Sequence, residues 1–405
     1  MRRRKFIYFL VISSIIKFLQ FSVYAKPDVE SLISISAGGG SDFFEGNAGS
    51  FTGNFNIDFI PALRFSDNTA LLPCYSGSYQ GVQQLQQLAE GGYLYQGELN
   101  NIVSFILLKK LKSGLILKPK IGYKLQLLKE TIDENWFEGL YDFHKLNCGI
   151  ELEKKRDNSK MNLGYEFNWL IFPNYESLAS YMGFYQPGKD LFDCLVNELF
   201  IKRASPFLKK MSIEYGYNFT YKYFTDQKKV LETTGYSSTN RYDLINSLGL
   251  NLAYPLKEFK LLKMRIKTLS GLNYDFTYNY SNQNYWERTT LMYIGGYYNY
   301  LENNIGPSFT FYFSPYLMGL TLSYEFSLRN YLNRPLQTVS GIYGEDKINQ
   351  KKHTISVRTD LPIYKRLSGY ALFNWQKVIS NMEYEQYYKY NYTAGYYLAG
   401  LTYKY

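Results

Sequence analysis

The last eleven residues of the chain, 395–405, read Gly-Tyr-Tyr-Leu-Ala-Gly-Leu-Thr-Tyr-Lys-Tyr. Successive side chains of a β-strand point to opposite faces, so a strand can be recognised by a period of two. One face of this stretch is apolar and aromatic, and it consists of Gly395, Tyr397, Ala399, Leu401, Tyr403 and Tyr405. The other face carries Tyr396, Leu398, Gly400, Thr402 and Lys404. The pattern predicts a strand of about ten residues that ends on an aromatic side chain.

The same alternation recurs inside the chain, at 161–171, 211–223 and 318–329. A strand that meets lipid on one face and water on the other must alternate in this way. The repeated apolar faces and the aromatic terminus resemble those of bacterial outer-membrane β-barrels, a porin-like class. The resemblance implies an all-β fold, a transmembrane antiparallel β-barrel, located in the cell outer membrane.

The composition agrees with a barrel. Tyr occurs 43 times and Phe 28 times, whereas the mean hydropathy is only −0.30. Barrels combine polar inward faces with aromatic girdles at both membrane interfaces. No stretch after residue 25 reaches the ~18 consecutive apolar residues of a spanning helix. The alternative, a secreted β-sandwich or propeller, would carry polar side chains on its outward faces.

Residues 1–25 have the pattern of a secretory signal peptide. Basic residues at 2–5 precede an apolar run at 6–16, and small residues precede a cut after Ala25. The apolar run is too short for the alternative, an uncleaved anchor helix. Five of the 45 basic residues lie in this segment, which leaves 40 against 35 acidic residues. So small a surplus does not suggest a nucleic-acid partner. We expect residues 26–405 to form a single barrel domain.

Short turns alternate with long polar loops, so we expect periplasmic turns and extracellular loops. The segment 288–303 is ambiguous. It reads as a hairpin with a two-residue turn at Gly295 and Gly296, and we place it outside the membrane because its arms are short. About 16 strands result, or 18 if this hairpin spans. The 16 predicted strands are 31–37, 51–60, 69–79, 93–108, 114–128, 140–153, 160–172, 191–204, 211–225, 241–254, 261–280, 305–313, 317–331, 351–361, 367–382 and 390–405.

One short motif occurs twice. Tyr165-Glu166-Phe167 and Tyr324-Glu325-Phe326 each begin a unit of strand, long loop, strand and Pro turn, which ends at Pro206 and Pro362 respectively. Duplication of a hairpin would produce this echo. The composition of strands and turns alone could also produce it.

Enzyme signals are few, and we predict no catalytic residue, cofactor or metal site. The only histidines are His144 and His353, and neither has a Ser two residues further along, as barrel phospholipases and deacylases have. Both are interpreted as strand-end residues at a membrane interface. The glycines at 38–40 are interpreted as a loop after a strand. The three cysteines have no metal-ligand spacing and are interpreted as buried or lipid-facing: Cys74, Cys148 and Cys194.

The inward faces carry charges of both signs, which a channel wall uses to tune the passage of ions and solutes. The alternative is an ion network that stiffens a plugged lumen. Loops 173–190, 281–304 and 332–350 are long enough to narrow the pore. The candidate pore-lining residues are Glu166, Glu214, Lys222, Arg265, Lys267, Asp275, Glu325, Arg329, Arg358 and Asp360.

Two predicted loops are rich in aromatic and amide side chains, at 133–136 and 280–286. Such side chains can stack on sugar rings, so saccharide binding is a hypothesis. They also occur in interface girdles, which is the alternative.

A barrel of about 16 strands leaves an aqueous interior. The sequence therefore favours a porin-like channel for passive passage of small hydrophilic solutes. The alternatives are a barrel that binds or exports a solute or surface polymer, and a structural or adhesive surface protein with a blocked lumen. The resemblance implies outer-membrane lipid and lipopolysaccharide as partners. It also implies the barrel-assembly machinery, which would recognise the strand ending at Tyr405.

Overall fold

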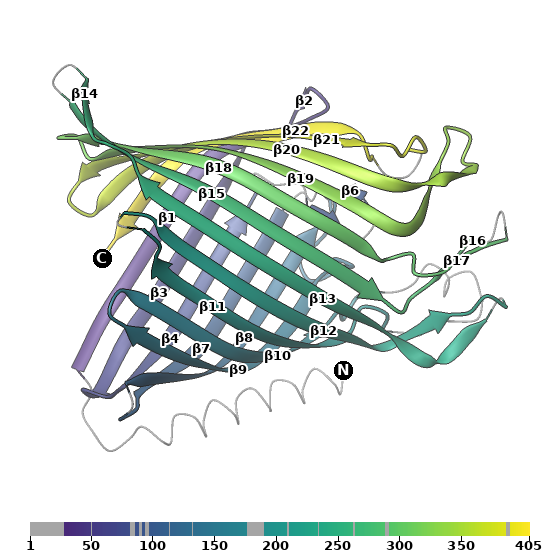
Figure 1. The fold of residues 1–405 in the computed structure, drawn as a ribbon, viewed down its shortest axis with the longest axis horizontal. Coiled ribbons are helices and arrows are strands. Elements are labelled where there is room, and N and C mark those ends of the chain that lie inside the picture. The colour runs from purple at the N-terminus through teal and green to yellow at the C-terminus, as the bar shows by residue number, and fades with distance from the viewer. Residues whose placement is uncertain are drawn as a thin grey trace.

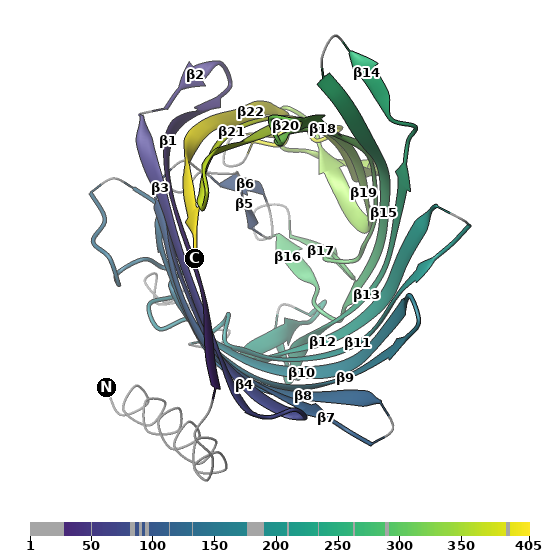
Figure 2. The same cartoon turned by 90° about the vertical axis from the view of Figure 1, so that its left-hand side faces the viewer.

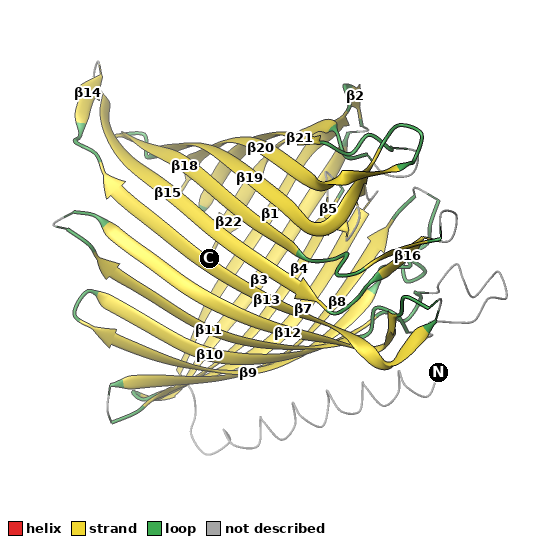
Figure 3. Ribbon diagram, turned by 45° about the vertical axis from the view of Figure 1, so that its right-hand side comes forward, coloured by secondary structure: helices red, strands yellow, loops and turns green. Residues whose placement is uncertain are grey.

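The computed structural model describes residues 28–405 except 50, 82–85, 89–90, 94–96, 113, 132, 176–189, 209, 234, 262–263, 288–290 and 386–388. The predicted signal peptide lies outside the described residues. Regular structure in the described residues is entirely β-strand (Figure 3). None of the described residues belongs to a helix that is long and apolar enough to cross a membrane.

Sixteen strands form the wall of a closed antiparallel barrel (Figures 1 and 2). Each strand pairs with the next along the chain, and the first pairs with the last to close the wall. The wall strands are β1 (Asp28–Phe44), β3 (Thr52–Ser66), β4 (Thr69–Gln80), β7 (Gly97–Lys110), β8 (Leu115–Lys129), β9 (Phe143–Arg156), β10 (Ser159–Ile171), β11 (Cys194–Pro206), β12 (Ser212–Val230), β13 (Tyr236–Pro255), β15 (Met264–Ser281), β18 (Tyr300–Ser314), β19 (Met318–Gln337), β20 (Tyr343–Tyr364), β21 (Leu367–Ser380) and β22 (Tyr392–Lys404).

The two ends of the barrel differ. One end carries mostly short connections, such as those from β3 to β4 and from β9 to β10, and we call it the turn end. The other, the loop end, carries the longer connections. In Figure 2, which looks along the barrel, two short hairpins of the loop end lie within the outline of the wall. The short strands are β2 (Asn47–Ala48), β5 (Gln86–Leu88), β6 (Gly91–Tyr93), β16 (Tyr285–Glu287) and β17 (Met292–Ile294) at the loop end, and β14 (Phe259–Leu261) at the turn end.

The prediction of a 16-strand barrel is confirmed, and the 18-strand alternative is wrong. A hairpin does form near the ambiguous segment, but its strands differ from the predicted ones. β16 pairs with β17, so that Tyr285 opposes Ile294, and Gly295 and Gly296 follow the hairpin. Gly296 has a φ of +64° and donates its N–H to Asn284 Oδ1 at 3.0 Å. The glycine pair therefore redirects the chain toward β18 and does not form the hairpin turn.

Two predicted loops are largely strand. β12 and β13 extend to residues 230 and 236, and β19 and β20 extend to 337 and 343, so only 231–235 and 338–342 connect them. The pairing contains register shifts between Tyr223 and Lys228 and between Asn330 and Pro335. A bulge interrupts the period of two, and polar residues replace the apolar face there. The alternation of apolar and polar residues therefore stops several residues before the hydrogen-bonded strands end, and the sequence predicts these strands too short.

The interpretation of residues 38–40 as a loop is wrong, because these glycines lie within β1. They pair with β22 on one side and with β3 on the other, at the seam where the barrel closes. A Cβ at Gly40 would overlap the backbone of Tyr397, and one at Gly400 would overlap the backbone of β1. The hydroxyl of Tyr370 fills the space over Gly38, 2.6 Å from where a Cβ would stand. The glycines allow close strand approach and do not form a turn.

The two faces of the wall have opposite character. Apolar side chains on one face remain exposed, as at Leu322 (39%) and Tyr397 (53%). Neighbouring residues such as Ser323 lie on the other face, which carries most of the side-chain hydrogen bonds and ion pairs of the wall. An exposed apolar band around a closed barrel is the surface that meets lipid. The polar face is therefore the interior face.

A repeated hydrogen bond occurs on the outer face of six hairpins that join at the loop end. In each, a Tyr hydroxyl of one strand bonds, at 2.6–3.1 Å, an Asn or His side chain that lies two residues nearer the loop end on the next strand. We call these pairs the tyrosine belt. They are Tyr75–Asn101, Tyr123–His144, Tyr165–Asn197, Tyr217–Asn246, Tyr274–Asn303 and Tyr324–His353.

The described residues of the two hairpins at the seam, β1–β3 and β21–β22, carry no such pair. Small residues stand side by side across these four strands, with Ala371 opposite Ala399, Ala399 opposite Gly39, and Gly39 opposite Gly53. We call this row the small-residue row. The ring of Phe51 lies against Gly39, 2.7 Å from where a Cβ would stand. The outer face is therefore uniform over six hairpins and different at the seam.

Candidate functional site

The ten candidate pore-lining residues all lie on the interior face, on β10, β12, β15, β19 and β20. The structure brings few of them together. Arg358 and Asp360 form an ion pair of 2.8 Å, and both side chains are half exposed. Arg265 and Lys267 approach the same carboxylate, Glu258 of the turn end, at 3.9 and 3.3 Å. Their role as a pore lining stays a prediction.

Arg329 has a partner that sequence reasoning missed. Its guanidinium forms an ion pair with Glu302 of β18 at 2.5 Å and lies 4.8 Å from the centre of the Tyr300 ring. Glu302 falls within the predicted loop 281–304 and so was not expected on a strand. The structure begins β18 at Tyr300, which sets Glu302 directly opposite Arg329.

A second group of charges was also missed, near the turn end of β8, β9 and β10. Glu153 has a side chain only 4% exposed and accepts from Lys118 at 2.6 Å and Lys160 at 3.0 Å. Lys118 also binds Glu151 at 2.7 Å. The sequence did contain the signal, since Glu151 and Glu153 lie two apart in a predicted strand and so share a face.

Arginines stacked on aromatic rings line the interior near the loop end. Arg241 pairs with Asp243 at 2.9 Å, and its guanidinium lies 4.4 Å from the ring centres of both Phe224 and Tyr298. Arg334 is 4% exposed, donates to the Tyr390 hydroxyl at 2.9 Å, and lies over the Tyr297 ring. Planar guanidinium groups stack well on aromatic faces. These contacts therefore connect loop-end segments to the wall strands β12, β13 and β19.

The segment between β15 and β18 is fastened to the end of β12 by two amide side chains. Gln283 accepts from the Val230 N–H at 2.9 Å and donates to the Lys228 carbonyl at 3.0 Å. Asn284 donates to the Val230 carbonyl at 2.7 Å. The two amides supply the hydrogen bonds that a neighbouring strand would otherwise make with the backbone of β12 at this edge. The segment is thereby held against the β12–β13 extension.

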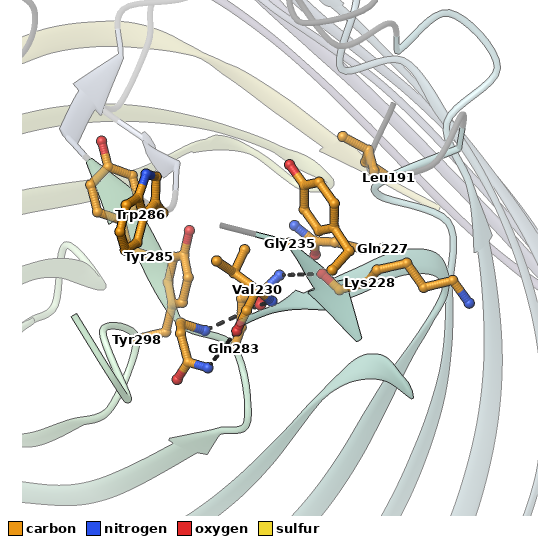
Figure 4. A pocket seen from close by; sticks show the side chains of 11 residues that line it. Leu191, Gln227, Lys228, Val230, Gly235, Gln283, Tyr285, Trp286 and Tyr298 are labelled. Carbon is orange, nitrogen blue, oxygen red and sulfur yellow. Dashed lines mark hydrogen bonds between the residues drawn. The ribbon is translucent and has the colours of Figure 1, made fainter. Parts of the chain in front are cut away.

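A cavity of about 440 Å³ lies between this segment and the β12–β13 extension (Figure 4). Most of its lining is aromatic or polar, with only Leu191 and Val230 contributing aliphatic side chains. A volume of this size is within the usual range for small-molecule sites. The aromatic and polar lining residues are Gln227, Lys228, Tyr236, Gln283, Asn284, Tyr285, Trp286 and Tyr298.

The structure separates the residues of the saccharide hypothesis. Those at 283–286 line the cavity, whereas Tyr280 stands exposed on the outer face of β15. Trp136, from the other predicted loop, packs against Tyr79 at 6.3 Å between ring centres, under the Lys129 ammonium. Only one of the two predicted loops therefore contributes to the cavity.

Two carboxylates hold loop-end connections, and their environments differ. Asp142 is 2% exposed, and burial raises its pKa to about 6 although it accepts a hydrogen bond from the Leu128 N–H at 2.7 Å. Burial would also raise the pKa of Glu385. Hydrogen bonds from the N–H groups of Tyr390 and Asn391 outweigh burial and hold this pKa below its usual value.

Neither of the two histidines considered for enzyme chemistry lies on the interior face. His144 and His353 belong to the tyrosine belt on the outer face, where each ring accepts or donates a hydrogen bond with a Tyr hydroxyl. The three cysteines are free. Within the described residues, no group of His, Cys, Asp and Glu side chains is arranged to hold a metal ion.

No protein-family model and no curated protein sequence matches the chain. Solved structures do resemble it. OmpT of Vibrio cholerae, folded in vitro, is 12% identical over 94% of this chain and 98% of OmpT, with a TM-score of 0.50. A trimer form of that protein is 10% identical over 94% and 100% of the two chains, also with a TM-score of 0.50. The anion-selective porin of Comamonas acidovorans is 8% identical over 94% and 100%, with a TM-score of 0.43.

At such low sequence identity, structural similarity establishes the fold of the chain but not its substrate. The fold has a closed wall of 16 antiparallel strands, an exposed apolar outer face and a polar interior. From this architecture and its likeness to OmpT, the chain has the fold of porin-like outer-membrane β-barrels.

Proposed function

We propose that the chain is a channel through which small hydrophilic solutes diffuse across the outer membrane. The observation that carries the proposal is the polar interior of the closed wall, where charges of both signs stand on many strands. Barrels of 16 strands are wide enough to leave an aqueous passage, whereas those of 8 strands are filled by their own side chains. The polar interior supports passage of water-soluble molecules.

The ten candidate residues named above would line this passage together with the charges found in the structure. Arg358 and Asp360, although paired, are half exposed and so remain accessible to a passing ion. Glu302 and Arg329 form a closer and more buried pair. Removal of one partner from such a pair exposes the charge of the other. Ion selectivity should therefore respond to either member.

The test is single-channel conductance of the refolded protein in a planar bilayer. The parent protein should conduct, and Arg329→Gln should shift the reversal potential toward cations because Glu302 loses its partner. Glu325→Gln should shift it toward anions. Lys377→Gln is the matched control, because Lys377 lies on the outer face, opposite His353 of the tyrosine belt. This control should leave the reversal potential unchanged.

A parent protein that inserts but never conducts would favour a blocked lumen, as in a structural or adhesive surface protein. The loop-end hairpins within the outline of the wall are the observation that keeps this second candidate (Figure 2). Identical reversal potentials in Arg329→Gln, Glu325→Gln and the parent would remove these two residues from the conduction path.

A further inference from the structure

The cavity between the β12–β13 extension and the 282–299 segment has two unlike walls. Figure 4 shows Tyr285 and Trp286 on one side and Gln227 and Lys228 on the other, with Tyr298 near the aromatic side. A ligand in the cavity would therefore meet aromatic rings on one face and nitrogen donors on the opposite face.

The aromatic wall is fixed by contacts behind it. Tyr285 stacks on Tyr297 with ring centres 4.6 Å apart and planes 25° apart, and Tyr298 meets Tyr297 edge-on at 5.1 Å. Arg334 covers Tyr297 at 4.5 Å, and Arg241 covers Tyr298 at 4.4 Å. Little side-chain entropy is lost when a ligand binds to a wall that is already ordered.

The polar wall offers donors more than acceptors. The Lys228 ammonium donates to Asn240 Oδ1 at 2.6 Å and to the Ser238 carbonyl at 3.5 Å, which uses two of its three N–H groups. Gln227 accepts from Arg241 at 3.4 Å through Oε1, and this bond leaves its NH₂ group for a ligand. Gln283 and Asn284 are occupied with the backbone of β12 and shape the cavity.

We propose that this cavity binds a saccharide ring, with its C–H face against Trp286 and Tyr285 and its hydroxyl oxygens toward Lys228 and Gln227. A purely apolar ligand would leave the third N–H of Lys228 and the NH₂ group of Gln227 buried without a hydrogen-bond acceptor. A small inorganic anion would not use the aromatic wall. A sugar ring has both an apolar face and oxygen acceptors at its edge, and so complements both walls. An acidic sugar additionally gives Lys228 a carboxylate, and charge-assisted hydrogen bonds are the stronger ones.

The inference rests on the proposed channel function, because it names the class of solute that the channel mouth would select. The probes are maltotriose, which is neutral, and the galacturonic acid trimer, which is acidic. Added on the loop-end side of a bilayer, each should interrupt the single-channel current, and the acidic trimer should do so at several-fold lower concentration. Lys228→Met should abolish the difference between the two sugars.

Trp286→Ala should raise the half-blocking concentration of both sugars at least about fivefold, because the aromatic wall loses its largest ring. Trp136→Ala is the matched control, since Trp136 is an aromatic residue of another loop-end connection and does not line the cavity. It should leave the block unchanged. An equal loss in both variants, or a conducting parent that neither sugar interrupts, would overturn the inference and leave the channel function standing.

If the parent does not conduct, the channel proposal fails and sugar binding is measured separately. Replacing Trp136, Trp169 and Trp375 by Phe leaves Trp286 as the only tryptophan in the chain. Its fluorescence in the folded barrel should change on titration with the acidic trimer. An unchanged spectrum up to high millimolar sugar would overturn the inference, and heat-modifiable migration on gels checks that each variant is folded.

Discussion

The outer face of the barrel is built in two ways. Six hairpins carry the tyrosine belt, in which a Tyr hydroxyl satisfies an Asn or His side chain on the neighbouring strand. The two seam hairpins carry the small-residue row, and on the interior face of the same strands Gly40 and Gly400 allow a close backbone approach. In lipid, a polar side chain needs a protein partner. In the belt hairpins, a hydrogen bond between side chains adds to the pairing of the backbones. At the seam, the lack of side chains at the glycines allows the backbones to approach closely.

The largest effect is expected at the seam. Gly40→Ala should abolish most of the folded, heat-modifiable form on gels, because the added methyl group meets the backbone of Tyr397 and Leu398 and cannot be moved aside. Gly53→Ala is the matched control. Its new Cβ would have only an ordinary contact of 3.4 Å, with the Gly38 carbonyl. Normal folding of Gly40→Ala would show that the seam tolerates wider strand spacing than the structure indicates.

A second experiment tests whether the belt and seam surfaces meet the same lipid. Leu322→Arg, in a belt hairpin, should cost ~2–4 kcal/mol of unfolding free energy, measured by urea titration in detergent or lipid. Tyr397→Arg, at the seam, should cost a similar amount, whereas Ser323→Arg on the interior face should cost little. A much smaller cost at Tyr397 than at Leu322 would show that the seam surface is covered by something other than lipid.

The belt hydrogen bond itself can be measured with a double-mutant cycle. Tyr217→Phe removes the hydroxyl that donates to Asn246 Oδ1 at 2.7 Å, and it should cost ~1–3 kcal/mol because the amide is left without its partner. The double variant Tyr217→Phe/Asn246→Leu should recover most of this cost. Tyr397→Phe, outside the belt, should be nearly neutral. Additive single effects would mean that the pair does not interact in the membrane.

The smallest effect is a contrast in pH dependence between one belt loop and one seam loop. Asp142 holds the β8–β9 connection and has a raised pKa of about 6. Its folded state binds the proton more tightly, so its stabilisation is complete below the ordinary Asp pKa and is lost as pH rises through about 6. Glu385 holds the β21–β22 connection with a lowered pKa. Its stabilisation is present above the ordinary Glu pKa and is lost as pH falls through the lowered value.

Amide hydrogen exchange between pH 4 and pH 8 measures this contrast, after correction for the intrinsic pH dependence of exchange. Protection of Leu128 should fall with rising pH, and Asp142→Asn should flatten this trend. Protection of Tyr390 and Asn391 should fall only at the acidic end, and Glu385→Gln should reduce it throughout. Parallel pH trends in the two loops would contradict the different environments of the two carboxylates.

The sequence predicts the wall strands because lipid contact requires the period of two. Two members of the tyrosine belt, Tyr165 and Tyr324, stand in the motif that occurs twice, but the motif did not predict their hydrogen bonds. The other four tyrosines of the belt do not stand in a shared motif. Each pair requires only a Tyr on one strand and an Asn or His on the next, so the residues beside the Tyr can vary. At Tyr75 the residue two further along is Gly77, and at Tyr123 it is Leu125. The sequence of one strand does not indicate which residue of the neighbouring strand its Tyr will bind.

The candidate site was less predictable for a related reason. Glu302 and Arg334 lie where the alternation of apolar residues stops, so both fall within predicted loops. Their partners, Arg329 and Tyr390, are distant in sequence, and pairing depends on how far the strands extend beyond the apolar band. The cavity depends on the same extension of β12 and β13. Residues 280–286 suggested sugar recognition from composition alone, but the composition could not show that only 283–286 line the cavity, nor which of these side chains bind the backbone of β12.

The glycine-rich seam also bears on the order in which the molecule is assembled. The pairing of β1 with β22 joins the two ends of the described chain, and its backbone hydrogen bonds between Ile33 and Tyr405 have the greatest sequence separation in the wall. Contacts of this kind require the largest loss of chain entropy and tend to form late. Until they form, β1 and β22 are open edges able to pair with another chain. At Gly38, Gly40 and Gly400 the two edges meet without a side chain that would have to be displaced.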